Sequence, residues 1–421
     1  MSQSAVILPG SPLTGAALAS DLNASFASVI SKFSGATAPT LGPGAASALV
    51  AGQEWLNTSV AGQYVWGIYD GAVFCPLATI DTTAHTATVP DGYRNIIGDN
   101  GSMEVWQRGS AATSSFAIPA STTAYTADRW YITTGANQAS VVAAVTNITN
   151  GSQLAGKITR NSGQTGTGVY TFGFPLDTNE VVRLRGGYAS INAVAKAGAN
   201  WSPASGTLTL TFYVGTGAAA KRGAGFTSET NVVSGSVNLA VNAQGTITAM
   251  SAATVPTTAT QGEIQFTWTP VGTAGGDDSI TIDDVQLEAG LIANAYERRP
   301  FERMITGCKR HFWKTFNYGV LPAQNVGLLS GEIMGIAGKA GALVEIIGVR
   351  HPVSMRGIPV ITTFNPGAAN AQVRDETVPA DCSSTANLQV TNETVFLSAT
   401  GNASTAVGNI LGVHLTADAG I

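Results

Sequence analysis

Residues 275–288, GGDDSITIDDVQLE, contain an alternation of hydrophobic residues that changes phase partway along. Ile280 and Ile282 fall on one face of a strand, because side chains in a strand repeat every two residues. Val285 and Leu287 continue the alternation with the opposite parity. One extra residue must therefore be accommodated between Ile282 and Val285, and this predicts a β-bulge within the strand.

The same stretch concentrates carboxylates in a chain that has few charges. It holds Asp277, Asp278, Asp283 and Asp284, although the whole sequence has only 26 acidic residues and 11% charged residues. Bulges redirect side chains and are common at the edges of sheets. The pattern therefore predicts the closing strand of a β-sandwich with oxygen ligands near its rim.

The middle of the sequence has the pattern of an all-β domain. Leu208, Leu210, Phe212 and Val214 alternate on one face of a strand. Similar runs recur along the chain, and the gaps between them are rich in Gly, Asn, Ser and Thr. No helical period of useful length lies between the runs, which favours a sandwich over alternating strands and helices.

Residues 11–33 are predicted to form one helix with a heptad pattern. Leu22, Phe26, Val29 and Phe33 step by four, three and four residues along one side. A helix of this length is marginal in isolation, so it needs a partner. The partner is either the β-structure of its own chain or another subunit in a larger assembly, and the sequence leaves both alternatives open.

A second helix is predicted at residues 300–316, between the sandwich and a final β-rich part. Phe301, Ile305, Cys308 and Phe312 repeat the steps of four, three and four residues. This spacing predicts that Phe301, Ile305 and Phe312 contribute to oligomerisation, together with the N-terminal seam.

Composition excludes several classes of protein. A net charge of −5 provides no basic surface for nucleic acid. No run of apolar residues approaches the length of a membrane span, so membrane insertion is not expected. A hydrophobic content of 44% with few charges argues against intrinsic disorder.

The sequence predicts no catalytic residues. The four histidines are scattered along the chain, and no GxSxG nucleophile motif is present. Glycoside hydrolysis needs two carboxylates facing each other across a cleft, whereas the one acidic cluster in the sequence falls on a strand rim. We therefore expect a protein that is not an enzyme.

Several motifs resemble a known module when they are taken together. They are NGSMEVWQRG (100–109), FAIPASTTAYTADRWY (116–131), ITIDDVQLE (280–288) and ERRPF (297–301). In combination they resemble a jelly-roll module of bacteriophage tail proteins, which is itself similar to carbohydrate-binding jelly rolls. In the flanks, GQEWLNTS (52–59) with YDG (69–71) resembles the β-hairpin units near tail-fibre N-termini, and LGVHLTAD (411–418) resembles a strand that often ends such fibres.

The resemblance implies a division of the chain into five parts and a mainly β fold in a fibrous trimer. The parts are an N-terminal assembly helix (1–34), a β-hairpin attachment unit with a linker (35–94), a jelly-roll β-sandwich (95–299), a linker helix (300–317) and a C-terminal β-domain (318–421).

The resemblance also implies two ligand sites. In carbohydrate-binding jelly rolls an acidic residue of the last strand often joins the first strand around calcium, which implies Asp283 or Asp284 with Glu104 or neighbouring carbonyls here. The alternative is a solvated turn in which an aspartate caps the bulge backbone. Among the aromatic residues near turns, Trp201 is the candidate for a sugar contact, although aromatic residues more often belong to the core.

The resulting hypothesis is a structural virion protein, made in the cytoplasm of a bacterial host and assembled into the particle. It would be a homotrimeric tail-fibre or appendage subunit that contacts other proteins of the tail, baseplate or collar and helps in host attachment, with a host surface glycan as a candidate ligand. The alternatives are a collar, neck or head fibre without a receptor role, and a tailspike that cleaves glycans.

Overall fold

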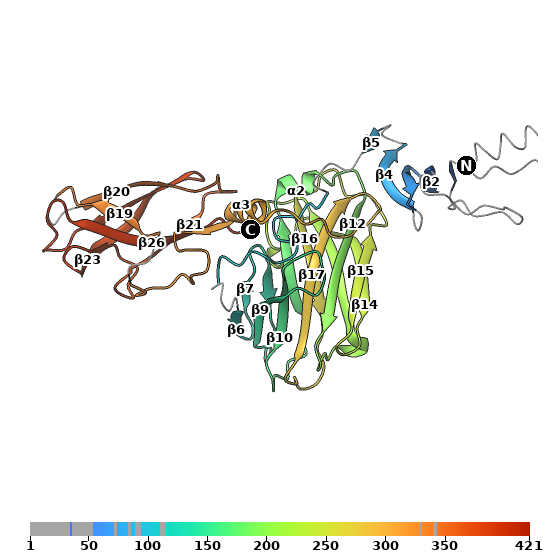
Figure 1. The fold of residues 1–421 in the computed structure, drawn as a ribbon, viewed down its shortest axis with the longest axis horizontal. Coiled ribbons are helices and arrows are strands. Elements are labelled where there is room, and N and C mark those ends of the chain that lie inside the picture. Colours follow the sequence, from blue (N-terminus) through green and yellow to red (C-terminus); the bar gives the residue numbers. More distant parts are fainter. Residues whose placement is uncertain are drawn as a thin grey trace, which may run out of the picture. The chain divides into compact units, whose positions relative to one another are not determined.

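The computed structural model describes residues 34–35, 54–70, 74–82, 86–88, 94–109, 115–327, 331–339 and 343–421. These residues are mainly β-structure with few helices, as the sequence predicts (Figure 1). They belong to two compact units, Met1–Arg94 and Asn95–Ile421. The predicted N-terminal helix, with Leu22, Phe26, Val29 and Phe33, lies outside the described residues.

The first unit contains a small sheet with the strand order β1-β2-β3-β4-β5. Its strands are β1 (Ser34–Gly35), β2 (Glu54–Val60), β3 (Gln63–Tyr69), β4 (Phe74–Asp81) and β5 (Thr86–Thr88). β1 pairs with β2 in parallel, and the other pairs are antiparallel. Strands β2, β3 and β4 fall within the part of the chain that is predicted to contain β-hairpins.

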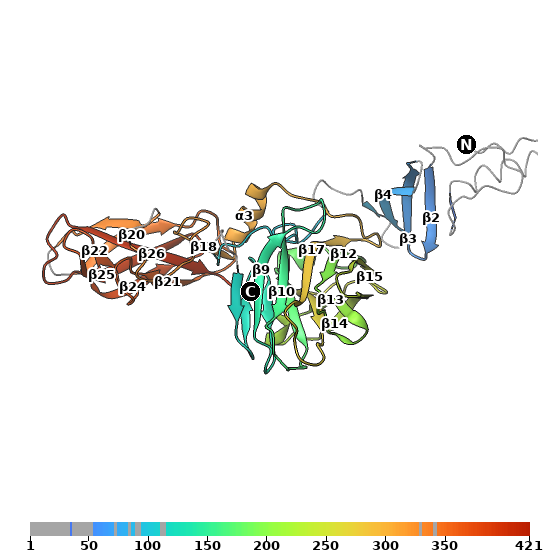
Figure 2. The same cartoon turned by 60° about the horizontal axis from the view of Figure 1, so that its bottom comes forward.

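The second unit begins with a β-sandwich of two six-stranded sheets (Figures 1 and 2). One sheet has the order β15-β12-β17-β10-β9-β6 and the other β14-β13-β16-β11-β8-β7. The first contains β6 (Ser115–Ile118), β9 (Ser140–Thr146), β10 (Leu154–Arg160), β12 (Ala189–Ala197), β15 (Gln244–Met250) and β17 (Asp278–Ala289). The second contains β7 (Thr123–Tyr125), β8 (Tyr131–Thr133), β11 (Tyr170–Leu176), β13 (Thr207–Gly215), β14 (Thr230–Asn238) and β16 (Gln261–Trp268). Helix α2 (Thr178–Val182) and the 3-10 turns η1 (Ala204–Gly206) and η2 (Arg222–Ala224) lie in the connections.

The core of the sandwich lies between the two sheets, because alternate residues of each strand point inward. Leu208 and Phe212 of β13 are fully buried, which confirms the predicted alternation of this strand. Trp130 stacks on Phe172 with ring centroids 4.8 Å apart. Burial of such aromatic side chains is the main source of stability in a domain of this kind.

Strand β17 contains the predicted β-bulge. Asn192 of β12 pairs with Gln286 and Val194 pairs with Asp283, so one residue of β12 faces two of β17. Asp284 lies in the bulge with φ of 48°, a conformation that few residues other than glycine adopt. The bulge keeps the apolar residues on both sides of it fully buried: Ile280, Ile282, Val285 and Leu287.

The linker helix is shorter than the sequence predicts. Helix α3 (Phe301–Lys309) is followed by strand β18 (Phe312–Lys314), so the prediction that the helix reaches residue 316 is wrong. The reason is that β18 pairs with β26 (Ile410–Asp418) and buries Phe312 and Trp313, each only 6% exposed. Pairing with a distant strand therefore overrides the local helical pattern.

The buried face of α3 differs from the predicted seam. Met304 and Cys308 are fully buried and pack on Val105 of the sandwich domain, with Ile305 partly buried beside them. Phe301 is 38% exposed, and its ring meets that of Tyr318 edge to face at 5.8 Å. Phe301, Ile305 and Phe312 thus do not form one stripe, because Phe312 is in a strand. A role of these residues in oligomerisation stays a prediction.

The C-terminal domain is built around β26. Strands β18, β19 (Ile333–Ile336), β21 (Val360–Phe364) and β22 (Arg374–Asp375) all pair with it, and β22 pairs with β23 (Ala380–Asp381). A second sheet contains β20 (Leu343–Arg350), β24 (Ser383–Val390) and β25 (Thr394–Thr400). The inward residues of β26, Leu411, Val413, Leu415 and Ala417, are fully buried. In the part of the chain that the structure describes, no helix has the length and apolar character needed to cross a membrane.

Candidate functional site

The acidic pair, Asp283 and Asp284, points into the loop between β9 and β10. Asp283 is fully buried, and its Oδ1 accepts hydrogen bonds from the Ser152 hydroxyl at 2.7 Å and from the Asp284 amide at 2.8 Å. Its Oδ2 accepts a hydrogen bond from the Ile148 amide at 3.1 Å. The hydroxyl of Thr149 donates to Asp284 Oδ2 at 2.5 Å. The bulge therefore directs two neighbouring carboxylates to one place.

The acidic pair has an unusual electrostatic environment. Burial raises the pKa of Asp284 to about 6, and the charge of Asp283 adds to this effect. Burial raises the pKa of Asp283 as well. Asp284 Oδ1 is buried and has no hydrogen-bond partner among the described residues. Two carboxylates in this situation are stabilised either by a proton on one of them or by a cation.

Glu104 is not part of the acidic pair. Its Oε1 accepts a hydrogen bond from the Gln153 amide at 2.7 Å and lies 3.2 Å from a guanidinium nitrogen of Arg298. Among the described residues, no three His, Cys, Asp or Glu side chains gather in a group that could hold a metal ion. The oxygen atoms of Asp283 and Asp284 are of the type that calcium prefers, and the calcium site stays a prediction.

Trp201 lies almost entirely inside the sandwich. It is 7% exposed, its ring centroid is 6.0 Å from that of Trp268, and its indole nitrogen donates to the Gly206 carbonyl at 3.1 Å. Its surroundings are those of a core residue with a satisfied polar atom. The sugar contact of Trp201 stays a prediction.

A groove of about 250 Å³ lies on the outer side of the second sheet. Its walls are formed by Val169, Pro203, Ala204, Thr207, Thr209, Thr267, Trp268 and Thr269. Thr209 and Thr267 are direct partners across β13 and β16, so their hydroxyls stand side by side. Hydroxyls both donate and accept hydrogen bonds, which is the chemistry that a polyhydroxylated ligand needs.

A second pair of carboxylates, Glu332 and Glu376, lies in the C-terminal domain. Both glutamates lie over Gly412 of β26, where any larger residue would collide with the Glu332 carboxylate. Burial and the charge of Glu376 raise the pKa of Glu332 to about 7. Both carboxylate oxygens of Glu332 are buried without a hydrogen-bond partner in the described structure. Sequence analysis missed this pair, because the two residues are far apart in the chain.

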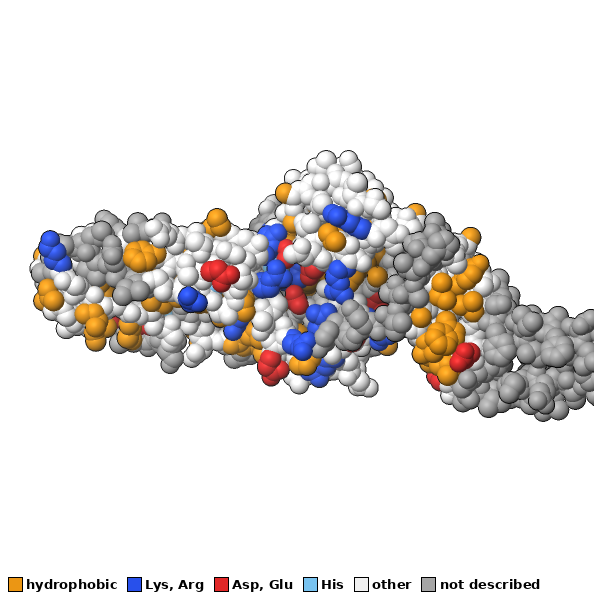
Figure 3. Space-filling model, turned by 90° about the horizontal axis from the view of Figure 1, so that it is seen from above, with side chains coloured by type: hydrophobic (Ala, Val, Ile, Leu, Met, Phe, Trp, Pro, Cys, Tyr) orange, Lys and Arg blue, Asp and Glu red, His pale blue; other side chains and the backbone are white. Residues whose placement is uncertain are grey.

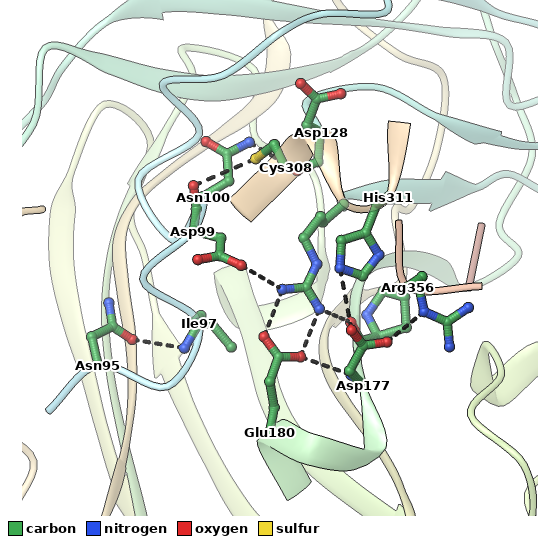
Figure 4. A network of polar contacts seen from close by, with 12 residues as sticks. Asn95, Ile97, Asp99, Asn100, Asp128, Asp177, Glu180, Cys308, His311 and Arg356 are labelled. Carbon is green, nitrogen blue, oxygen red and sulfur yellow. Dashed lines mark hydrogen bonds and ion pairs between the residues drawn. The ribbon is translucent and has the colours of Figure 1, made fainter. Parts of the chain in front are cut away.

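An extended polar network lies where the sandwich meets α3 and the C-terminal domain (Figure 4). We call it the junction, and it contains Asp99, Arg108, Arg129, Asp177, Glu180, His311, Arg356 and Asp418. Both terminal nitrogens of Arg129 donate to Glu180, at 2.6 and 2.7 Å, and one lies 3.4 Å from Asp99. Burial alone would lower the pKa of Arg129, but Glu180 and Asp99 raise it, so Arg129 remains charged.

Asp177 connects the sandwich directly to the C-terminal domain (Figure 4). It is the N-cap residue of α2, and its Oδ1 accepts a hydrogen bond from Arg356 Nε at 2.5 Å. His311 Nε2 lies 3.5 Å from Asp177 Oδ2. Burial, together with the charges of Arg129 and Arg356, lowers the pKa of His311 well below its usual value. His311 is therefore neutral at neutral pH, and the charged contact to Asp177 comes from Arg356.

Arg108 makes the second connection between the two domains. It donates to both carboxylate oxygens of Asp418 on β26, at 2.6 and 3.1 Å. Its guanidinium group lies over the ring of Phe312 at 4.0 Å and over that of Tyr125 at 4.6 Å. The Tyr125 hydroxyl donates to the Ile421 carbonyl at 2.8 Å, so the chain returns to the sandwich after β26.

The separate sequence motifs come together beside the junction. The Ile96 amide donates to the Leu287 carbonyl at 2.8 Å, and the Val285 amide donates to the Gly101 carbonyl at 3.1 Å. Trp106 and Trp130, one from each of the first two motifs, are buried at 1% and 0% exposure. The first and last segments of the sandwich are therefore held together by main-chain hydrogen bonds.

Sequence analysis did not identify the junction, although one signal was present. Charged residues are rare in this chain, yet Arg108, Asp128 and Arg129 interrupt the two most aromatic motifs. Charged side chains in such surroundings are buried only when they are paired. The signal predicts buried ion pairs, but it does not identify partners such as Glu180 and Asp418.

Comparison with known proteins gives no family for this chain, since no family model and no curated protein matches it. Similar solved structures include the enzymatically active domain of tailspike protein 4 of bacteriophage CBA120, at 17% identity over 48% of this chain and 22% of that chain, with a TM-score of 0.25. Another is the CBM22-1 xylan-binding domain of Paenibacillus barcinonensis Xyn10C, at 12% identity over 46% of this chain and 93% of that chain, with a TM-score of 0.26. A carbohydrate-binding module of the β-sandwich superfamily matches at 10% identity over 56% of this chain and 74% of that chain, with a TM-score of 0.26.

Proposed function

We propose that this chain is a structural, non-catalytic subunit of a bacteriophage tail fibre or related appendage, which assembles as a homotrimer and contributes to host attachment. The motifs that resemble tail-protein jelly rolls support this proposal. In the structure the opening motif is hydrogen-bonded to the closing strand and forms an ion pair with the segment after it. The opening motif also forms an ion pair with the next domain, between Arg108 and Asp418.

The junction is the observation that carries the proposal. Two partly buried ion pairs, Arg108–Asp418 and Arg356–Asp177, connect the two β-domains. The more deeply buried pair Arg129–Glu180 lies beside them within the sandwich. Ion pairs cost desolvation energy, so they contribute more to a defined geometry than to net stability. A fixed angle between successive domains is what a fibre needs in order to transmit force and to present its tip.

The presence of the chain in the particle is the direct test. Antibodies against the purified protein should label the tail or its appendages in electron micrographs of the phage that encodes it. Labelling at the head or the neck would favour the rival proposal of a head, collar or neck fibre. Absence of the chain from purified particles would refute a virion role altogether.

We further propose that the threonine-lined groove is where the sandwich contacts a host glycan. Its paired hydroxyls and neighbouring apolar atoms suit a sugar, which presents hydroxyls along its edges and an apolar face. A glycan array with the wild type and the Thr209→Val, Thr267→Val double variant tests this. Equal binding by both proteins would place the glycan contact elsewhere, and Trp201→Phe would then be the next variant to examine.

The rival proposal of a glycan-cleaving tailspike rests on the pair Glu332 and Glu376. Burial raises the pKa of both carboxyl groups, and two neighbouring carboxyl groups of this kind can act as acid and base in glycoside hydrolysis. Incubation with host capsule or lipopolysaccharide should release no reducing sugar if the protein is only structural. Release that disappears in the Glu332→Gln variant would establish the enzymatic alternative.

A further inference from the structure

The sheet of the first unit has a hydrophobic face whose side chains are mostly not buried. The register places Leu56, Tyr64, Trp66, Ile68, Cys75, Ala78 and Ile80 on the same side of β2, β3 and β4, and we call this side the Trp66 face. Ala78, at 7% exposure, is its one buried residue, whereas Trp66 is 38% exposed and the others are half-buried. Hydrophobic side chains gather on this part of the molecule in Figure 3.

The opposite side of the sheet does not bury the Trp66 face either. It carries the aromatic cluster of Trp55, Tyr69 and Phe74, whose side chains are also only partly buried. Across the described side chains of this sheet, Ala78 is the sole buried hydrophobic residue. A small sheet in water needs at least one covered hydrophobic face to be stable, so the Trp66 face requires a cover.

The path of the chain indicates what supplies this cover. Ser34 of β1 pairs with Leu56 of β2, and Leu56 belongs to the Trp66 face. Residue 33 therefore leads directly into the sheet, beside the face that needs a partner. A segment tethered this closely has an effective concentration in the millimolar range, which favours it over a partner in free solution.

The preceding sequence has the matching chemistry. Leu22, Phe26, Val29 and Phe33 make one apolar stripe if residues 11–33 are helical, as their spacing predicts. Such a helix would extend for about 34 Å. A strand such as β3, with seven residues, extends for about 23 Å. The stripe itself, from Leu22 to Phe33, spans about 17 Å, so it covers about three quarters of the length of β3.

We propose that residues 11–33 pack on the Trp66 face of their own chain and complete the core of the N-terminal unit. The sequence alone leaves two partners for this segment open, and its short tether to β1 favours the sheet of the same chain. The inference does not depend on the proposed function, because it concerns folding within one chain. It implies that particle attachment uses a pre-folded unit rather than a free helix.

Cys75 is a natural reporter, because it lies on the Trp66 face while the other two cysteines are buried elsewhere. Cys308 and Cys382 are 0% and 1% exposed and serve as internal references. Alkylation of the full-length protein, resolved by mass spectrometry, should be slow at Cys75. In the Phe26→Ser, Phe33→Ser variant it should become faster by on the order of tenfold, because burial limits the access of reagent to a thiol.

The matched control changes the opposite side of the predicted helix. Ser28→Asn with Ser31→Asn should leave the rate at Cys75 unchanged. Equal rates in the wild type and the Phe26→Ser, Phe33→Ser variant would overturn the proposal. Protection of Cys75 that is lost on dilution would overturn it as well, because the cover would then be a second copy of the chain.

A cross-link gives a readout that does not depend on a destabilising substitution. With Val29→Cys, a short bis-maleimide should join the new cysteine to Cys75 within one chain, so the product keeps the monomer mass after denaturation. Ser28→Cys on the far side should not react in this way. A product of twice the monomer mass in the first variant would indicate a partner chain and refute the proposal.

Discussion

Arg129 and Glu180 form a bidentate ion pair in the buried junction, with nitrogen to oxygen distances of 2.6 and 2.7 Å. The pair joins the motif before β8 to helix α2, and Asp177 at the start of the same helix receives Arg356 from the C-terminal domain. The geometry of the whole junction therefore depends on where α2 is held.

Replacement of Arg129 by methionine should strongly destabilise the protein. It leaves Glu180 buried without its cation, whereas Asp99 still has Arg299 at 3.6 Å. Removal of one partner of a buried pair costs about 3–5 kcal/mol. Urea unfolding of the second unit measures this loss. Arg222→Met is the control, because Arg222 and Glu229 are each about one third exposed and the loss should be about 1 kcal/mol or less. A similar effect of both substitutions would show that Glu180 does not depend on Arg129 to compensate its charge.

The acidic pair predicts an inverse dependence of stability on pH. Burial and Asp283 raise the folded-state pKa of Asp284 from 3.8 to about 6, so the folded protein binds this proton more tightly than the unfolded chain does. The resulting stabilisation is complete below pH 3.8 and is lost as the pH rises through about 6. With a chelator present, Asp284→Asn should therefore raise the melting temperature at pH 8 and have a smaller effect at pH 5. A lower melting temperature of the variant at both pH values would contradict this account.

Calcium should reverse the effect of the Asp284→Asn substitution on the melting temperature. An ion bound only by the folded state stabilises it by mass action, so calcium should raise the melting temperature of the wild type. Asp283→Asn or Asp284→Asn should abolish the increase. The opposite outcome is that the wild type gives the same melting curve with calcium and with chelator. In that case the acidic pair has only a structural role in the bulge, with a proton on one of its carboxyl groups.

The purified protein should be a trimer. The resemblance of the sequence motifs to tail-fibre proteins and the low charge of the chain lead us to expect a mass of about three times 42.9 kDa. Light scattering coupled to gel filtration measures it. A monomer at micromolar concentration would argue against a fibre.

Host contact should map to the second unit. Loops on a rigid scaffold usually carry recognition, and the C-terminal domain offers such loops around Asn365 and Asn402. A fragment of residues 95–421, which forms a compact unit with its own core, should bind host cells or compete with phage adsorption. A fragment of residues 1–94 should bind the particle and not the cell. Cell binding by the N-terminal fragment would reverse the proposed polarity, and binding by neither would favour a collar or head location.

The sequence predicted those features that depend on neighbouring residues. The bulge at Asp284 follows from the parity of Ile282 and Val285, which are close in the chain. The end of α3 was predicted incorrectly because Phe312 pairs with Asp418, more than 100 positions away. No local pattern contains that information.

The two carboxylate pairs differ in the same way, in how far apart their residues are in the sequence. Asp283 and Asp284 are adjacent, so their proximity is visible in the sequence. Glu332 and Glu376 lie on different segments of the C-terminal domain, and the pair forms only because both side chains lie over Gly412. Glu180 and Arg356, like them, reach the junction only through tertiary folding.

The positions of β17 and β26 have a consequence for synthesis on the ribosome. Each is the last strand of its domain, yet β17 lies between β12 and β10, and β26 pairs with β18, β19, β21 and β22. The sheet that contains this strand cannot be completed in either domain until the strand has been translated, so the nascent chain exposes unpaired strand edges until then. We therefore expect truncated translation products to aggregate, and yield in a recombinant host to depend on chaperones that shield these edges until the closing strand emerges.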